Sequence, residues 1–167
     1  MFDRARAIDR VAPPAASLLA QAARPRGAYA DAYRVEIAAE VGLDGYLAAF
    51  FMTPIFRTER RLLALAGFPS GPADVAALAT GASGRFSVWE VAARRGEECL
   101  LRDVTWRTRS WFLVEPICSG TRLWFGSAVL PAEGASRLGT ASRLSLGPHR
   151  AYSRLLLAAA AARLDQR

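Results

Sequence analysis

A run of β-branched and aromatic residues between Gly84 and Pro131 constrains the fold more than any other part of the chain. Turn-forming residues interrupt it at 94–97, 106–107 and 117–120. The segments between these interruptions are rich in Val, Phe, Trp and Leu, which predicts four consecutive antiparallel strands joined by short turns. The other segments are then expected to form helices that cover this sheet.

Tight hairpins would fix the strand register, and the register decides on which face each side chain lies. In the predicted register Val88 lies opposite Asp103, Asp103 opposite Ser110, and Phe112 opposite Phe125. One face is then mostly apolar and is expected to receive the helices. Its predicted members are Phe86, Val88, Glu90, Ala92, Cys99, Leu101, Asp103, Ser110, Phe112, Val114, Leu123, Phe125, Ser127 and Val129.

The opposite face alternates arginines with tryptophans and places Glu115 opposite Arg122, as is typical of a half-solvated antiparallel face. Its three tryptophans are Trp89, Trp111 and Trp124. Three interpretations stay open for this Trp/Arg face: a packed outer surface with cation–π pairs, a dimer or partner surface, and a platform for single-stranded nucleic acid.

Residues 1–28 are expected to form an arm on the surface, and 29–167 a single α+β domain. Residues 31–37 alternate like a strand and must pair non-locally, at an edge of the sheet. Helices are predicted over 44–52, over 54–66 with Thr53 as N-cap and a stop at Gly67, and over 72–80. A final helix from Pro148 to about Arg163 is expected to lie across the apolar face. Its predicted buried stripe is Tyr152, Leu155, Leu156, Ala159 and Ala162.

The composition restricts the partners. The net charge of +7 comes from 22 basic residues that are all arginine, scattered without a long basic run, and this argues against a nucleic-acid-binding protein. Two separated cysteines and one histidine give no metal-ligand spacing, and no cofactor is expected. The apolar tract 155–162 is too short to span a bilayer, and acidic residues near the N-terminus do not suit a signal peptide. A cytoplasmic location is the simplest expectation.

The order of elements resembles the helix-grip fold of START-like proteins, which include polyketide cyclases and plant lipid-binding allergens. Residues 30–35 (ADAYRV), 51–54 (FMTP) and 109–111 (RSW), with His149-Arg150 opening the last helix, are similar to a bacterial domain family of unknown function. That family is sometimes attached behind a NAD(P)-binding reductase domain, but this chain has no Gly-x-Gly-x-x-Gly motif. The resemblance covers about residues 28–165, although clear strands are fewer than in a full START-like fold. It implies a pocket for a small molecule or lipid between the sheet and the final helix, and it transfers no catalytic residue.

Carboxylates on the predicted inner face are informative because burying an unpaired charge is costly. Glu59 interrupts the apolar arc of its helix, and Glu90 and Asp103 point inward in the predicted register. These acids either join a polar patch in the pocket or pair with arginines and cap turns. The candidate ligand-binding residues are therefore Glu59, Glu90, Asp103, Ser110, Phe112 and Tyr152, and His149 could join them.

Three functions follow as hypotheses. The first is binding of an apolar or amphipathic small molecule or lipid between the sheet and the final helix. The second is a cyclase- or isomerase-type enzyme that uses a buried carboxylate with a raised pKa. The third is an interaction module, for example a homodimer through Trp89, Trp111 and Trp124.

Overall fold

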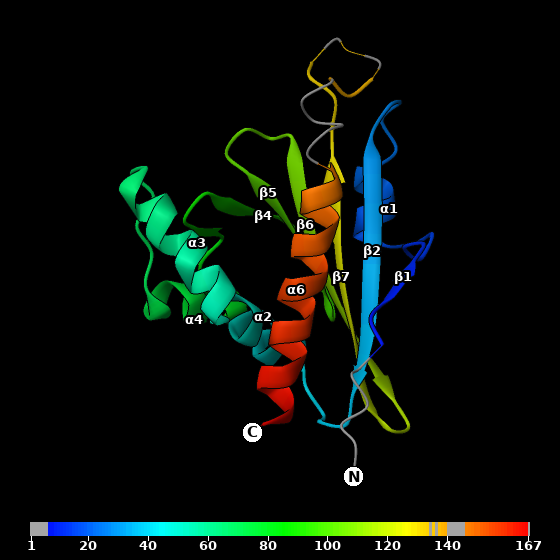
Figure 1. Ribbon diagram of the computed structural model, residues 1–167, viewed down its shortest axis with the longest axis vertical. Coiled ribbons are helices and arrows are strands. Elements are labelled where there is room, and N and C mark those ends of the chain that lie inside the picture. Colours follow the sequence, from blue (N-terminus) through cyan, green and yellow to red (C-terminus); the bar gives the residue numbers. More distant parts are fainter. Residues whose placement is uncertain (1–6, 134, 136, 140–145, 167) are drawn as a thin grey trace.

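The computed structural model describes residues 7–133, 135, 137–139 and 146–166. The chain forms a seven-stranded sheet with the order β1-β2-β7-β6-β5-β4-β3, in which every neighbouring pair is antiparallel, and α6 packs across one face (Figure 1). The fold is therefore α+β with a helix-grip-like layout, as predicted. The strands are β1 (Asp9–Val11), β2 (Tyr29–Ile37), β3 (Arg85–Phe86), β4 (Trp89–Arg95), β5 (Glu98–Asp103), β6 (Thr108–Ile117) and β7 (Gly120–Val129). The helices are α1 (Leu18–Ala22), α2 (Leu43–Phe51), α3 (Pro54–Leu65), α4 (Pro72–Thr80) and α6 (Leu146–Asp165).

The register of the central hairpin β6–β7 is the predicted one, with Phe112 opposite Phe125. Between β5 and β6 the prediction is wrong by two residues, since Ser110 lies opposite Leu101. A shift of two leaves every side chain on its predicted face. The cause is a longer turn than expected, in which the carboxylate of Asp103 accepts hydrogen bonds from the backbone N–H groups of Arg107 and Thr108, each at 3.1 Å.

The faces of β4 are reversed relative to the prediction. Trp89 lies opposite Asp103, which places the indole on the inner face, and Glu90 lies opposite Arg102 on the outer face. Gly96 in the β4–β5 turn has a φ of 55°, and a register shift between Val91 and Ala93 marks a β-bulge at Ala92. The turn and the bulge together displace the pairing of β4 by one residue. The side chains of β4 that were predicted to face inward therefore face outward, and the reverse.

The N-terminal arm covers the outer face of the sheet, which is therefore not half-solvated at its centre. Trp111 is completely buried and Trp124 is 6% exposed, in a second core that α1 closes with Leu18 and Leu19. β1 also pairs with β2, so β2 is an inner strand of the sheet. The predicted edge position of β2 is therefore wrong. With Trp89 on the other side of the sheet, the three tryptophans share no common face. The predicted dimer surface built from them is therefore wrong.

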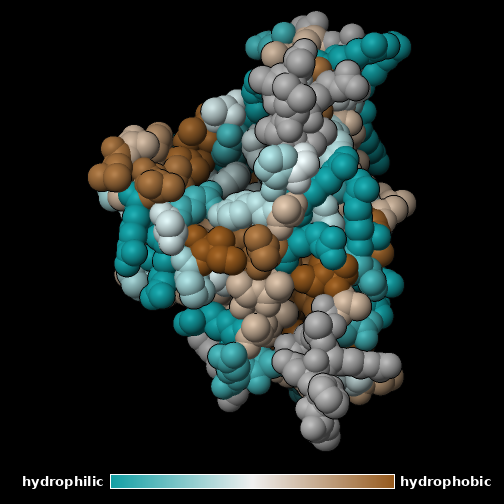
Figure 2. Space-filling model, viewed as in Figure 1, coloured by the Kyte–Doolittle hydropathy of each residue, from teal (hydrophilic) through white to brown (hydrophobic). Residues whose placement is uncertain are grey.

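The helices begin and end close to the predicted positions. The Thr53 hydroxyl accepts the N–H of Phe56 at the start of α3, and Gly81 ends α4 with a φ of 78°. In α3 only Phe56 is fully buried, and Leu62 and Leu65 are 64% and 87% exposed. Figure 2 shows hydrophobic side chains gathered over this outer end of α3. The predicted apolar arc of the helix is thus only partly covered.

The buried stripe of α6 is rotated relative to the prediction. Leu155 is 57% exposed, and Ala162 is exposed as well. The buried side chains of this helix include Ser153, Leu156, Leu157, Ala160, Ala161 and Leu164. The rotation follows from packing, because α6 lies against β2 and also against α2. Among the described residues, no helix is long and apolar enough to cross a membrane.

Candidate functional site

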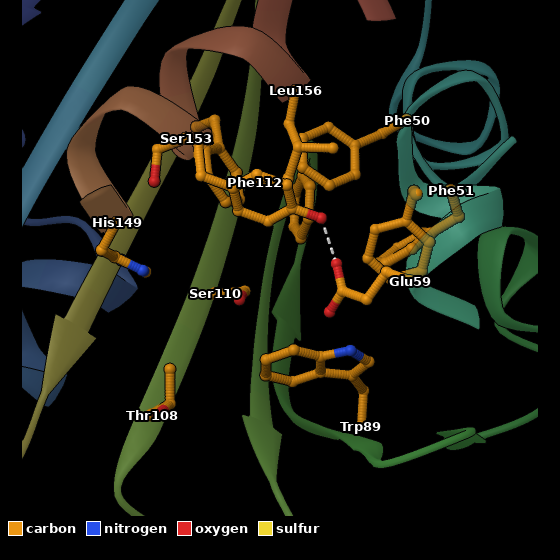
Figure 3. A pocket seen from close by; sticks show the side chains of 13 residues that line it. Phe50, Phe51, Glu59, Trp89, Thr108, Ser110, Phe112, His149, Ser153 and Leu156 are labelled. Carbon is orange, nitrogen blue, oxygen red and sulfur yellow. Dashed lines mark hydrogen bonds between the residues drawn. The ribbon is translucent and has the colours of Figure 1, made fainter. Parts of the chain in front are cut away.

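A cavity of about 180 Å³ lies between the inner face of the sheet and the helices α2, α3 and α6 (Figure 3). The residues that line it are Phe50, Phe51, Phe56, Glu59, Trp89, Thr108, Ser110, Phe112, Phe125, His149, Tyr152, Ser153 and Leu156. It sits beside the N-terminal half of α6. Farther along α6, the small residues Ala160 and Ala161 are buried and bring the helix close to its neighbours. The cavity therefore lies beside the part of α6 that is farther from its neighbours, between the sheet and the final helix.

The floor of the cavity changes from polar to apolar along one strand. Every second side chain of β6 points to this face of the sheet, namely Thr108, Ser110 and Phe112. Successive members of this row are about 6.6–6.8 Å apart along the strand. Ser110 lies opposite Ser127 of β7, and Phe112 lies opposite Phe125. Phe112 continues into the aromatic cluster of the main core, where its ring centroid is 4.8 Å from that of Phe50. One end of the cavity is thus closed by packed rings, and the other end carries hydroxyl groups.

Glu59 enters the cavity from α3 and is bonded to Tyr152 of α6. The phenol hydroxyl donates a short hydrogen bond to one carboxylate oxygen, and the second oxygen lies on the side of Trp89 (Figure 3). Burial raises the pKa of Glu59, and the hydrogen bond from Tyr152 opposes this shift. Burial and the neighbouring carboxylate also raise the pKa of the Tyr152 hydroxyl, which therefore stays protonated. The pair is a carboxylate and a phenol donor held in largely apolar surroundings.

A network of hydrogen-bonded polar side chains lies next to the end of the cavity that carries hydroxyl groups. Nε2 of His149 and Oγ of Ser127 share a hydrogen bond of 2.8 Å, and Ser127 Oγ lies 3.3 Å from Asp31 Oδ1. Asp31 is buried and also accepts hydrogen bonds from the hydroxyls of Tyr29, at 2.8 Å, and Tyr33, at 3.2 Å. Burial, followed by the charge of Asp31, raises the pKa of Tyr33 to about 12. Since a serine has one proton, donation to Asp31 requires that His149 donate to Ser127.

This network contains Ser, His and Asp but does not form a catalytic triad. In a triad the carboxylate orients the imidazole, which in turn activates the serine. Here the carboxylate of Asp31 contacts Ser127, and Ser127 stands between the acid and His149. The arrangement holds His149 at the cavity wall and does not activate a nucleophile.

Two polar atoms in the cavity wall have no hydrogen-bond partner among the described residues. They are Nε1 of Trp89 and Oγ of Ser153, a residue that is only 1% exposed. Burying an unsatisfied donor or hydroxyl costs about 1–3 kcal/mol. Both side chains line the cavity, and their unsatisfied polar atoms set them apart from a packed core, in which buried polar groups are normally hydrogen-bonded.

Four of the six predicted site residues come together in this cavity, namely Glu59, Ser110, Phe112 and Tyr152. Glu90 does not, because it lies on the outer face and pairs with Arg102 at 3.0 Å. Asp103 does not either, because its carboxylate caps the β5–β6 turn. For both acids the second alternative is correct, because Glu90 pairs with an arginine and Asp103 caps a turn. The role of the other four as ligand contacts stays a prediction.

For two of the wall residues that sequence reasoning missed, the predicted orientation was wrong. Trp89 was assigned to the outer face, and only the bulge at Ala92, which has no sequence signature here, brings it inward. Ser153 lay outside the predicted buried stripe of α6, although its place three and four residues before Leu156 and Leu157 could have marked it.

Metal ions and reactive thiols have little support at this site. The described part of the chain holds no group of three or more His, Cys, Asp or Glu side chains placed to bind a metal ion. Cys99 is buried, and burial raises the pKa of its thiol to about 11, which keeps it protonated at neutral pH.

The comparison of this chain with protein-family models, curated proteins and solved structures gave no match.

Proposed function

We propose that this protein binds a small apolar molecule of one or two rings in the cavity between the sheet and α6. The observation that supports this proposal is the cavity itself, about 180 Å³ in volume with a mostly aromatic wall. An apolar cavity of about 150 Å³ is large enough to bind benzene. Ligand sites for larger molecules measure about 300–1,000 Å³. The volume therefore favours a compact ring system over a long-chain lipid.

The wall chemistry agrees with binding. Ligand sites are mostly apolar and carry a few polar groups that orient the ligand. Here those groups are Glu59 with Tyr152 on one side and Ser110 with His149 on the other (Figure 3). Both cysteines are free, which suits the cytoplasmic location expected from the sequence.

Binding can be tested with indole as a neutral two-ring probe. Isothermal titration calorimetry and the shift in unfolding temperature would be measured for the parent protein and for Ser153→Leu, which fills the cavity from α6. Ala158→Leu, at an exposed position of the same helix, is the matched control. A ligand at about 100 times its Kd stabilises the folded state by about 2.7 kcal/mol.

We expect indole to raise the unfolding temperature of the parent and of Ala158→Leu, but not that of Ser153→Leu. If indole and benzene both leave the parent unchanged at saturating concentration, the cavity does not bind small apolar molecules. Equal binding by Ser153→Leu would place the bound probe elsewhere.

A proton-transfer enzyme of the cyclase or isomerase type is the second candidate. The observation that favours it is the raised pKa of Glu59 beside the Tyr152 hydroxyl. It ranks second because one acid, not two, reaches the cavity among the described residues. The test is the exchange of the α-protons of 2-indanone with deuterium oxide, followed by NMR. Exchange that is no faster than in buffer, or no slower with Glu59→Gln, would argue against this activity.

A further inference from the structure

The charge inside the cavity is unbalanced. Glu59 is the only acidic residue among the described residues that line it, and no arginine lines it, although the chain contains 22 basic residues. Its hydrogen-bond partner is the neutral hydroxyl of Tyr152, and no described cation lies within ion-pair distance. Two acids of the neighbouring strands differ in this respect, since Glu90 pairs with Arg102 and Glu98 with Arg95.

Aromatic side chains share the cavity wall with this carboxylate. Phe51 lies on the helix side of Glu59 and Trp89 on the sheet side (Figure 3), and Tyr152 is its hydrogen-bond partner. The faces of such rings carry negative electrostatic potential and attract cations, and Trp does so most strongly. A partly buried carboxylate that shares a cavity with aromatic side chains is therefore complementary to a positively charged group.

We infer that the natural ligand of this cavity is an organic amine, whose protonated amino group lies at Glu59 and whose apolar body of one or two rings fills the space toward Phe112 and Leu156. This inference rests on the proposed function and narrows its ligand class. The ammonium group would donate hydrogen bonds to the carboxylate oxygen that Tyr152 leaves free.

Comparison of the three ligand charges favours the amine. An anionic ligand would meet the charge of Glu59 in a partly desolvated space, with no arginine among the described lining residues to compensate. A neutral ligand would leave that carboxylate as unbalanced as before. A cationic ligand supplies an opposite charge to a partly buried carboxylate, where the attraction is stronger than in bulk water.

Two other titratable side chains face the same space, both from α6. Tyr152 stays protonated because its pKa is raised, and His149 lies on the opposite side, bonded to Ser127. Glu59 is thus the group whose protonation would control amine binding in acid. Burial raises the pKa of Glu59, so its carboxylate becomes protonated at a higher pH than the carboxylate of an exposed glutamate does.

The test compares benzylamine with benzyl alcohol, which have the same ring and the same number of heavy atoms but differ in charge. Calorimetric titration would be carried out on the parent protein, on Glu59→Gln and on Glu90→Gln. The last variant removes a carboxylate of the outer face and is the matched control. The parent measurement also stands alone, should Glu59→Gln fail to fold.

We expect the parent and Glu90→Gln to bind benzylamine at least about 10-fold more tightly than benzyl alcohol, and Glu59→Gln to lose this preference. Benzylamine affinity of the parent should also fall between about pH 7 and about pH 4, while benzyl alcohol affinity stays constant. If benzyl alcohol binds as tightly as benzylamine, the amine inference fails and the proposed binding function stands. If neither compound nor indole binds, both fail together.

Discussion

Glu98 offers the sharpest test of how the N-terminal arm is held on the sheet. This buried side chain sits on β5 beneath α1 and accepts three hydrogen bonds. Its Oε1 receives the backbone N–H of Leu18 and the indole N–H of Trp111, each at 2.6 Å. Its Oε2 receives Nη2 of Arg95 at 2.9 Å. One oxygen therefore serves both buried donors, and the other serves an arginine whose side chain is 58% exposed.

This division predicts different effects for two substitutions. Glu98→Ala leaves two buried N–H groups without an acceptor, at about 1–3 kcal/mol each, so the expected loss of unfolding free energy is about 2–6 kcal/mol. The exposed Arg95 pair adds little because solvent screens it. Glu98→Gln retains an oxygen in the Oε1 position and loses only the charge of the acceptor, which should cost about 1 kcal/mol.

Urea denaturation followed by tryptophan fluorescence would measure both variants, since Trp111 lies at the anchor itself. Limited proteolysis within residues 12–27 would report whether α1 leaves the sheet before global unfolding. The reasoning is refuted if Glu98→Ala is as stable as the parent, or if Glu98→Gln is destabilised as much as Glu98→Ala.

Three further predictions concern packing and charge. Leu157→Ala should cost about 2–5 kcal/mol and Leu155→Ala less than about 0.5 kcal/mol in urea denaturation, because the first side chain is fully buried and the second is 57% exposed; equal losses would contradict the orientation of α6. Gly126→Ala should cost about 1–3 kcal/mol, because a Cβ there would lie 2.5 Å from Leu19 Cδ2 and 2.9 Å from a backbone oxygen; an unchanged urea midpoint would show that α1 is not so close. Burial raises the pKa of Glu59 in the folded state, so its ionised form lowers stability at neutral pH, and this loss disappears as the pH falls through the raised pKa. Glu59→Gln should therefore exceed the parent in unfolding free energy near pH 7 by more than near pH 4; a margin that grows in acid would show the opposite sign.

The parts of the fold that depend on local signals could be predicted from the sequence. Thr53 followed by Pro54 starts α3, and Gly81 in the left-handed conformation ends α4. The β6–β7 hairpin has the predicted register because its turn is short, with Ile117 opposite Gly120. Each of these features is decided by neighbours in the sequence.

The features that sequence reasoning got wrong depend on contacts between distant residues. Every residue from 155 to 162 is Leu or Ala, so the composition of α6 gives almost no preferred face, and α2 and β2 decide its rotation. The bulge in β4 reversed Trp89 and Glu90, because the side-chain period of a strand turns a one-residue error into an exchange of faces. The burial of Trp111 depends on α1, which lies about 90 residues earlier in the chain.

The cavity itself follows from side-chain size along two strands. On β6 and β7 the inward pair Ser110 and Ser127 lies next to the inward pair Phe112 and Phe125. The inner face of the sheet therefore carries small side chains at one end and large rings at the other. Protein interiors are close-packed, and a space without partner atoms loses dispersion energy along its wall. Ser110, Glu59 without a described cation beside it, and Ser153 without a hydrogen-bond partner each depart from the pattern of an apolar core. Departures of this kind are expected at functional sites, and here they all face one cavity.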